Sequence, residues 1–178
     1  GLGNAVGMAL GESLGRQRFP DLIDHYTYSI VGDGCLMEGI SQESISLAGH
    51  WGLGKLIVLW DDNGISIDGP TSLTTSDDQL LRFESSRWHT QKVDGHNIEA
   101  LQQAMMNARS DSRPSLIACQ TSIGWGVPSV EGTAKAHGTP LSMDQIQQMA
   151  QDLNWPCIPF EVPEDVLSQW RLLGRSSE

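Results

Sequence analysis

Short apolar runs alternate with helical segments along this chain, and this alternation restricts the possible folds more than any other feature. Four runs are apolar or rich in β-branched and aromatic residues, and we predict strands over His25–Val31, Lys55–Trp60, Trp88–Val93 and Ser115–Gln120. Helices are predicted over roughly Ser41–His50, Asp77–Arg87 and, after the cap Asn97, on the face of Ile98, Leu101, Met105 and Ala108. Strand–helix–strand units of this length form right-handed crossovers. The sequence therefore predicts an α/β fold with three layers, α/β/α, around a mainly parallel sheet.

The amino-terminal segment predicts a helix with a regular stripe of glycines. Gly3, Gly7, Gly11 and Gly15 recur every four residues, a spacing that lets another backbone pack closely against one side of the helix. A phosphate-binding loop is the alternative interpretation of GLGNAVG, but no strand precedes it. Because Gly1 is not Met and opens the helical pattern directly, we expect the chain to be a piece of something longer.

The carboxyl-terminal third contains a long loop and a clear helix start. Glycines and prolines dominate Gly124–Pro140, and Ser142 with Gln145 forms a capping box for a helix that runs to about Leu153. Prolines then recur at 156, 159 and 163. We therefore predict one domain over residues 1–155, followed by a wrap-around segment and the start of an inter-domain linker over residues 156–178.

Charge and cysteine content exclude several classes of function. The formal net charge of the 178 residues is −11, so a nucleic acid or an anionic membrane surface would be repelled over most of the molecule. Three cysteines without metal-binding spacing favour a reducing, cytoplasmic setting, and no apolar run is long enough to span a bilayer. The sequence predicts a protein that binds neither nucleic acid nor membrane.

Two strand ends carry polar turns suited to a metal and a phosphate. Asp33 stands between two glycines after the first strand and offers a hard carboxylate oxygen, while Gly34 lets the backbone approach a phosphate. Asn63 follows the second strand in DDNG and offers a neutral carbonyl oxygen. In parallel sheets ligands bind beyond the carboxyl ends of strands. Each motif taken alone is also typical of an ordinary turn.

Taken together, the motifs resemble a known family. GDG followed by Asn after about thirty residues is the thiamine-diphosphate binding pattern. The surrounding segments DHYTYSIVGDGCLMEGISQESISLAGH and KLIVLWDDNGISIDG closely resemble transketolase. DGHN, PSLIACQTSIGWG, GTAKAHGTPL and IPFEVPEDV continue the resemblance in order, so it covers essentially the whole chain.

The resemblance implies a cofactor anchor built on a divalent metal. It implies that Mg²⁺ or Ca²⁺ is coordinated by Asp33, the Asn63 side chain and the backbone carbonyl of Ile65. It also implies that Gly34 and Asn63 contact the diphosphate of the cofactor. These residues would make residues 1–155 the diphosphate-binding, or PP, domain of such an enzyme, without its amino-terminal part.

Further positions match family residues around the reacting groups. His137 matches a histidine that contacts both the diphosphate and the substrate, and it is the one catalytic residue that the resemblance implies. Ile67 matches an apolar position near the thiazolium ring, and Glu38 matches a glutamate in a carboxylate network at the subunit interface. The sequence departs from the family pattern at Arg87, where a glycine is usual before Trp88.

The resemblance also implies a reaction and the partners it needs. The parent enzyme transfers a two-carbon ketol unit from a ketose phosphate such as xylulose 5-phosphate to an aldose phosphate such as ribose 5-phosphate. It is a homodimer in which a pyrimidine-binding domain completes the cofactor site. No such domain is recognised in this sequence, so we expect the chain alone not to turn over.

Three alternatives remain open from the sequence. A related thiamine enzyme, such as dihydroxyacetone synthase or deoxyxylulose-phosphate synthase, would share the GDG and Asn motifs and differ in its acceptor. A split transketolase would need a separate partner chain. A non-catalytic module that binds a partner would lack affinity for metal and thiamine diphosphate even with the missing half supplied.

Overall fold

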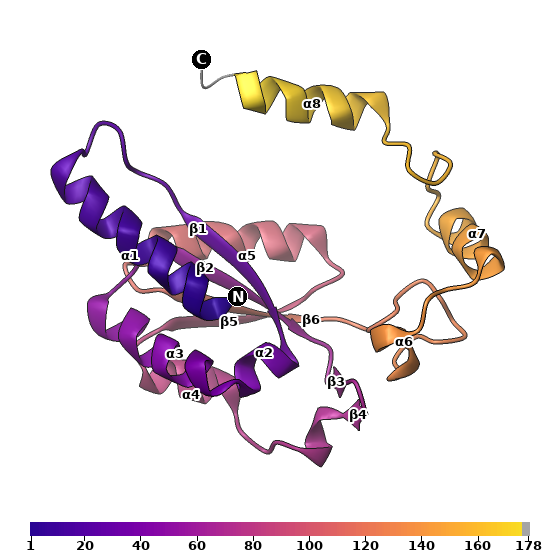
Figure 1. Ribbon diagram of the computed structural model, residues 1–178, viewed down its shortest axis with the longest axis horizontal. Coiled ribbons are helices and arrows are strands. Elements are labelled where there is room, and N and C mark those ends of the chain that lie inside the picture. The colour runs from indigo at the N-terminus through magenta and orange to yellow at the C-terminus, as the bar shows by residue number, and fades with distance from the viewer. Residues whose placement is uncertain (176–178) are drawn as a thin grey trace.

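The computed structural model describes residues 1–175 and contains a four-stranded parallel sheet (Figure 1). The strands run in the spatial order β1 (Thr27–Gly32), β2 (Leu56–Asp62), β6 (Ser115–Gln120) and β5 (His89–Asp94). Each predicted strand is confirmed within two residues at either end, and β6 has the predicted bounds. A two-stranded antiparallel hairpin follows β2 and comprises β3 (Ile65–Ser66) and β4 (Gly69–Pro70).

Helices cover both faces of this sheet. One face packs against α1 (Leu2–Arg18), α2 (Asp33–Met37), α3 (Gly39–Trp51) and α4 (Gln79–Ser85), and the other face packs against α5 (Ile98–Ser110). The predicted three-layer α/β/α class is therefore confirmed. A 3-10 turn, η1 (Thr71–Leu73), links the hairpin to α4. In residues 1–175 no helix is long and apolar enough to cross a membrane.

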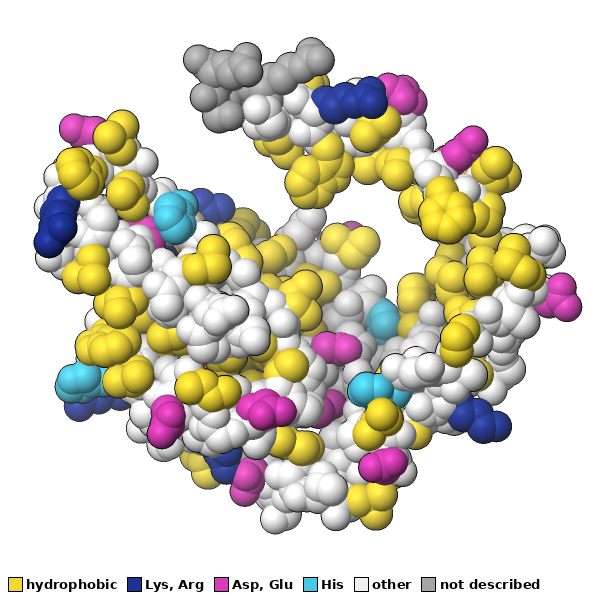
Figure 2. Space-filling model, in the orientation of Figure 1, with side chains coloured by type: hydrophobic (Ala, Val, Ile, Leu, Met, Phe, Trp, Pro, Cys, Tyr) yellow, Lys and Arg dark blue, Asp and Glu magenta, His cyan; other side chains and the backbone are white. Residues whose placement is uncertain are grey.

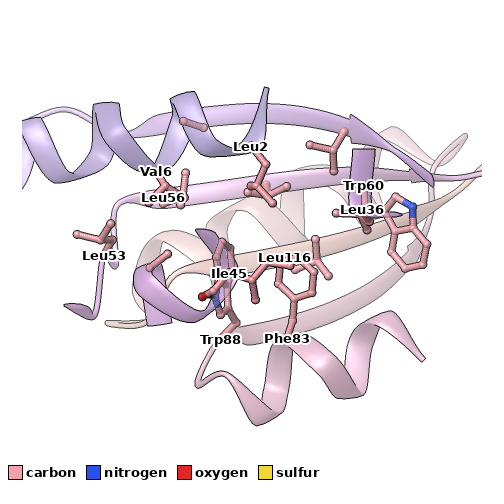
Figure 3. Packing of buried hydrophobic residues seen from close by; sticks show 14 of the residues in the cluster. Leu2, Val6, Leu36, Ile45, Leu53, Leu56, Trp60, Phe83, Trp88 and Leu116 are labelled. Carbon is pink, nitrogen blue, oxygen red and sulfur yellow. Dashed lines mark hydrogen bonds between the residues drawn. The ribbon is translucent and has the colours of Figure 1, made fainter. Parts of the chain in front are cut away.

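The core forms because the central strand β2 is apolar on both faces. Leu56, Val58 and Trp60 point into the larger cluster with α1, α3 and α4, which includes the fully buried Phe83 and Trp88 (Figure 3). The alternate side chain Ile57 instead packs under α5 with Ile117, Ala104 and Ala108. A strand buried on both faces is typical of the middle of a parallel sheet. The two clusters hold β2 and the polar residues at its carboxyl end in a fixed position.

Three local predictions are wrong. The turn expected at Gly32–Gly34 is the start of α2, because Gly32 adopts an extended conformation as N-cap and Asp33 already begins the helix. Ile98 is 65% exposed rather than part of the buried face of α5, because it lies in the first turn, at the edge of the sheet. Leu101 and Met105 do pack against the smaller cluster.

The glycine stripe of α1 is the third, because side chains and not another backbone lie close to it, and only at its two ends. A Cβ on Gly3 would lie 3.3 Å from Ser44 Oγ of α3, and one on Gly15 would lie 2.8 Å from Ile23 Cδ1. Cβ atoms on Gly7 and Gly11 would meet no atom within 4 Å. The reason is that α1 approaches α3 at its amino end and diverges from it further along (Figure 1).

The carboxyl-terminal third extends away from the sheet (Figure 1). The predicted loop contains one short helix, α6 (Lys135–Gly138), and the predicted capping box of Ser142 and Gln145 is confirmed at the start of α7 (Met143–Asp152). The last described element is α8 (Glu164–Arg175). The boundary at 155 and the linker over 156–178 stay predictions, and residues 176–178 of that segment lie outside the described residues.

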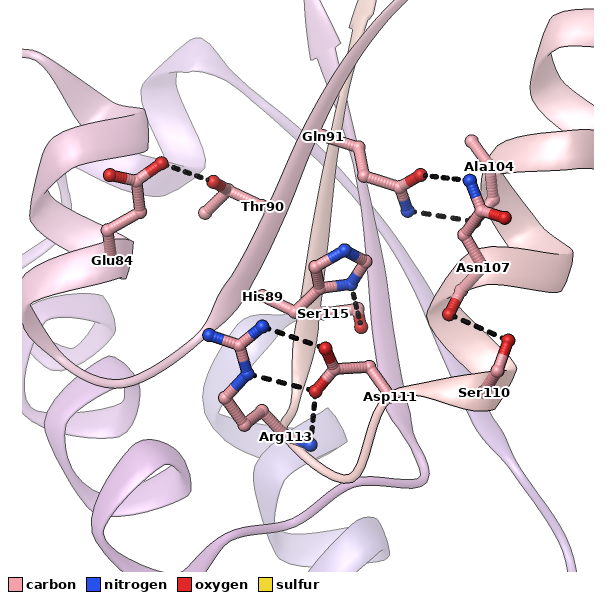
Figure 4. A network of polar contacts seen from close by, with 10 residues as sticks. All are labelled: Glu84, His89, Thr90, Gln91, Ala104, Asn107, Ser110, Asp111, Arg113 and Ser115. Carbon is pink, nitrogen blue, oxygen red and sulfur yellow. Dashed lines mark hydrogen bonds and ion pairs between the residues drawn. The ribbon is translucent and has the colours of Figure 1, made fainter.

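A polar network fixes β5 between α5 and β6 (Figure 4). Gln91 on β5 donates from Nε2 to the carbonyl oxygen of Ala104 at 2.8 Å and accepts from Asn107 Nδ2 at 3.0 Å. In the loop that leads into β6, Arg113 donates to both carboxylate oxygens of Asp111, from Nε at 2.9 Å and from Nη2 at 2.7 Å. The first two bonds hold β5 against α5, and the last two stabilise the loop between α5 and β6.

Candidate cofactor and metal site

A cleft of about 920 Å³ lies at the carboxyl ends of β1 and β2. All seven residues predicted for the site line it: Asp33, Gly34, Glu38, Asn63, Ile65, Ile67 and His137. They come from three separate segments, namely α2 with the residue that follows it, the turn and hairpin after β2, and α6. Figure 2 shows a hollow on this face of the molecule with acidic and histidine side chains around it. The fold thus brings together residues that are about a hundred positions apart in the sequence.

Asp33 is held at the cleft by two hydrogen bonds. Its Oδ1 accepts from the indole Nε1 of Trp60 at 3.2 Å, and its Oδ2 accepts from the backbone nitrogen of Gly64 at 3.2 Å. Burial raises the pKa of the Asp33 carboxyl, and the nearby Asp62 and Asp61 raise it further, while the two hydrogen bonds oppose this shift. No cation among the described residues contributes to the shift. A bound metal ion would therefore stabilise the ionised carboxylate of Asp33.

The Asn63 side chain is oriented by its neighbours. Its Oδ1 accepts from the backbone nitrogen of Ile65 at 3.0 Å, and its Nδ2 donates to Asp61 Oδ2 at 3.0 Å. Asp61 in turn accepts a hydrogen bond from the hydroxyl of Thr121, just past β6. Gly64 has φ +68°, a left-handed conformation that suits glycine and turns the chain into the hairpin. An amide oxygen has two lone pairs, so Asn63 Oδ1 keeps one for a further ligand.

The donors at the cleft fit the predicted cofactor anchor. A carboxylate, an amide oxygen and a backbone carbonyl are the oxygen ligands that Mg²⁺ and Ca²⁺ prefer. The space where Cβ atoms on Gly32 or Gly34 would lie holds no atom within 4 Å, so an anion can approach the backbone there. In residues 1–175 no group of three His, Cys, Asp or Glu side chains could hold a metal. A metal at this cleft would therefore need amide and carbonyl oxygens as well as Asp33.

Three of the predicted residues line the cleft with side chains that make no hydrogen bond to the described part of the chain. They are Glu38, Ile67 and His137. Ile67 is 69% exposed, which is unusual for a large apolar side chain unless something covers it. The side chains of Glu38 and His137 are exposed as well. All three are free to meet a ligand.

The sequence analysis missed the polar role of Trp60 and the residues behind the site. Trp60 is buried, as expected of a core tryptophan, but its indole N–H also positions Asp33. The signal that could have found it is its place as the last apolar residue before DDNG.

Burial raises the pKa of the Cys119 thiol to about 11, and the nearby Asp61 and Asp62 raise it too. Cys119 is therefore not a reactive thiol.

The fold and the site together define a class of protein. A parallel α/β sheet with oxygen donors and open glycine backbone at the carboxyl ends of its strands is typical of an α/β domain that binds its ligand at that edge. The family model described as "Transketolase, thiamine diphosphate binding domain" matches residues 1–177. The chain therefore belongs to the transketolase family, as its motifs predicted.

Relatives named transketolase align with nearly all of the chain. It is 49% identical over its whole length to the transketolase of Cereibacter sphaeroides and covers 27% of that protein. It is 51% identical to the transketolase of Sinorhizobium medicae, where 96% of the chain aligns with 25% of the relative. The chain thus spans about a quarter of the length of these relatives.

Solved structures give the same assignment. Transketolase from Campylobacter jejuni superposes with a TM-score of 0.88 at 36% identity, over 93% of this chain and 26% of that one. A mutant transketolase from Pichia stipitis, described as a complex with xylulose-5-phosphate, superposes with a TM-score of 0.88 at 40% identity, over 96% of this chain and 26% of that one. At this identity the likeness extends beyond the fold to the family.

Proposed function

We propose that this chain forms the diphosphate-binding side of a thiamine diphosphate site that is anchored by Mg²⁺ or Ca²⁺. The metal is bound by the Asp33 carboxylate, the Asn63 amide oxygen and the Ile65 carbonyl oxygen. The observation that carries this proposal is that all three residues line one cleft. The acidic protein binds an anionic cofactor because the metal lies between the carboxylate and the diphosphate.

The remaining cleft residues have distinct roles in this proposal. The backbone at Gly34 and the Asn63 side chain contact the diphosphate, and the exposed Ile67 covers an apolar part of the cofactor. His137 donates a hydrogen bond to a diphosphate or substrate oxygen, which suits an imidazole. Glu38 belongs to a carboxylate network at an interface between subunits. The exposed side chains of Glu38, Ile67 and His137 at the cleft support the roles of these three residues.

The proposed parent reaction is ketol transfer between sugar phosphates. A two-carbon unit moves from a ketose phosphate such as xylulose 5-phosphate to an aldose phosphate such as ribose 5-phosphate, within the pentose phosphate pathway. Thiamine diphosphate, when bound, supplies the electron sink for this chemistry. The names of the relatives and the xylulose-5-phosphate complex of the Pichia stipitis protein support this assignment.

The chain contributes one part of the complete site. We propose that a pyrimidine-binding domain, on the same polypeptide or on a second chain, completes it in a cytoplasmic homodimer. The share of the relatives that the chain spans, about a quarter, supports this. The chain alone is then expected not to catalyse ketol transfer, and turnover by the purified chain without any partner would contradict this expectation.

The test of the proposal is metal-dependent cofactor binding. Thiamine diphosphate is titrated with and without Mg²⁺ into the chain, alone and with the pyrimidine-binding part of a relative, and binding is followed by calorimetry. Binding should require the metal and fall at least tenfold in Asp33→Ala. Asp21→Ala is the matched control, because Asp21 is an exposed acid in the loop between α1 and β1 and does not line the cleft. Equal affinity in Asp33→Ala would rule out the metal assignment.

A further inference from the structure

The turn Asp94–Asn97 joins β5 to α5 and contacts the loop that follows β6. In this turn the imidazole Nε2 of His96 accepts a hydrogen bond from the backbone nitrogen of Ser122 at 3.0 Å. The His96 ring also stacks on the indole of Trp125, with centroids 4.6 Å apart and planes at 25°. The functions proposed above use neither contact.

His96 is held in place by the residues beside it. The Asp94 carboxylate accepts from the backbone nitrogen of His96 at 2.9 Å, and the backbone nitrogen of Gly95 donates to the carbonyl of Gln120 at 2.7 Å. Asn97 caps α5 with its side chain. The turn is thus fastened both to β6 and to α5, so it presents the His96 ring from a fixed position.

The contacts of His96 act where the loop leaves the sheet. The backbone nitrogen of Thr121 still donates to the carbonyl of Asp62, in β2, at 3.3 Å. The next nitrogen along the chain, that of Ser122, donates to His96 instead. An imidazole nitrogen that accepts a hydrogen bond carries no proton, so this geometry requires the neutral ring with its proton on Nδ1. His96 therefore fixes the first part of the loop beyond the sheet.

This part of the loop packs against the helix that carries His137. The carbonyl of Ile123 accepts from the backbone nitrogen of Gly132 at 2.8 Å, which closes the loop on itself. Gly124 has φ +68°, and a Cβ there would lie 2.8 Å from the Cβ of Ala136, in α6. Ile123, Ala136 and His137 all line the cofactor cleft. The placement of α6 at the cleft thus depends on the segment that His96 holds.

We propose that His96 is a positioning residue, which fixes the start of the loop so that α6 holds His137 at the cleft before any ligand binds. A side chain that is already in place loses less conformational entropy on binding, which favours affinity. The inference rests on the proposed function, because it gives His96 a role through His137 in binding thiamine diphosphate. The hydrogen bond and the stack lie within this chain, so they can be tested separately from cofactor binding.

Limited proteolysis of the full chain with trypsin measures how firmly the loop is held. Lys135 is the only Lys or Arg between Arg113 and Arg171, so cleavage after it reports on this loop. His96→Ala removes the acceptor and the stack and should speed this cleavage about tenfold. His96→Gln restores an acceptor near the position of Nε2 and should keep the rate within about threefold of the unmodified chain.

Two controls separate a loosened loop from a general loss of stability. His25→Ala changes an exposed histidine before β1 that does not line the cleft, and it should leave the rate unchanged. Cleavage after Arg18, at the end of α1, is the internal reference. An equal increase after Arg18 and after Lys135 in His96→Ala would overturn the inference. Equal cleavage after Lys135 in His96→Ala and in the unmodified chain would overturn it as well, whether or not thiamine diphosphate binds.

Calorimetric titration of thiamine diphosphate with Mg²⁺, with the pyrimidine-binding part of a relative supplied, tests the link to His137. His96→Ala should weaken binding about three- to tenfold, but it should cause no further loss in a chain that already carries His137→Ala. Additive losses would show that His96 does not act through His137 and would overturn the inference. If the unmodified chain binds no thiamine diphosphate, the proposed function falls and the role of His96 in binding falls with it, even where proteolysis shows that His96 holds the loop.

Discussion

The ring of Phe83 meets the ring of Trp88 edge to face, with centroids 4.8 Å apart and planes at 82°. The pair lies at the carboxyl end of α4. There the backbone nitrogen of Trp88 donates to the backbone carbonyl of Phe83 at 3.1 Å, and the backbone nitrogen of Arg87 donates to the backbone carbonyl of Glu84 at 2.9 Å. These two bonds and the apolar contact form a Schellman motif. The motif places Arg87 in the left-handed region, at φ +67°.

Arg87→Gly is predicted to stabilise the protein. A left-handed conformation costs a residue with a Cβ about 1–2 kcal/mol, and the greater freedom of glycine in the unfolded chain offsets about 0.5–1 kcal/mol of that. The expected net gain is about 0.5–1 kcal/mol, measured as the free energy of unfolding in urea. Arg87→Ala keeps the Cβ and should show no such gain. A lower stability of the glycine variant would contradict this reading of the helix end.

Gly49→Ala is predicted to disrupt the packing of α3 against α4. A Cβ at Gly49 would lie 1.7 Å from the carbonyl oxygen of Ser86, a backbone atom that cannot move aside alone. We expect a loss of at least about 2 kcal/mol in unfolding free energy. Gly7→Ala is the control, because its Cβ would meet no atom within 4 Å, and alanine in an exposed helix should add about 1 kcal/mol. Similar effects of the two substitutions would show that α3 and α4 do not meet as described.

Asp111 is predicted to make stability depend on pH in the acid range. Its hydrogen bond to Arg113 lowers the pKa of the Asp111 carboxyl to about 2, from 3.8. A lowered pKa stabilises the folded state above pH 3.8, and this contribution is lost as the pH falls towards 2. Because the Arg113 side chain is half exposed, solvent screening limits the effect to about 0.5–1 kcal/mol.

The check on this ion pair compares thermal unfolding midpoints at two pH values. Asp111→Asn should lower the midpoint at pH 7 and should match the unmodified chain near pH 2. Asp21→Asn serves as the control, since the Asp21 side chain is exposed and forms no ion pair with the described residues. A difference that persists unchanged at low pH would mean that the pair acts through packing and not through charge.

Metal binding at Asp33 is predicted to weaken at a higher pH than metal binding by an aspartate with the ordinary pKa. Burial raises the pKa of the Asp33 carboxyl above 3.8, so protons compete with the metal at a higher pH. In the metal-free chain the raised pKa of Asp33 affects stability in the opposite direction to the lowered pKa of Asp111. Asp33 stabilises the folded state at low pH, and this contribution is lost as the pH rises through its raised pKa. Mg²⁺ affinity measured by calorimetry should therefore fall about tenfold per pH unit below that pKa. A midpoint at or below pH 3.8 would contradict the buried environment of Asp33.

Much of the site could be predicted because its motifs are local. Asp33 between two glycines and Asn63 before Gly64 each follow an apolar strand, and the alternation of strands places both at one edge of a sheet, although Asp33 begins a helix and not the expected turn. His137 came only from family resemblance, because a histidine in a glycine-rich loop has no distinctive pattern. The indole of Trp60 was not predicted to bind Asp33, since its place before DDNG puts it near the site but does not say that its N–H reaches a carboxylate 27 positions away.

The sequence by itself determined the layer architecture, the capping box at Ser142 and the membership in the transketolase family, because periodicity, capping and motif order are encoded by neighbouring residues. Only the tertiary structure decided which glycines of α1 meet another segment, that Arg87 takes a left-handed conformation, and that the Trp60 indole donates to Asp33. The physical reason is that these depend on distances between segments remote in the chain. Packing of whole helices sets those distances, and no local pattern records them.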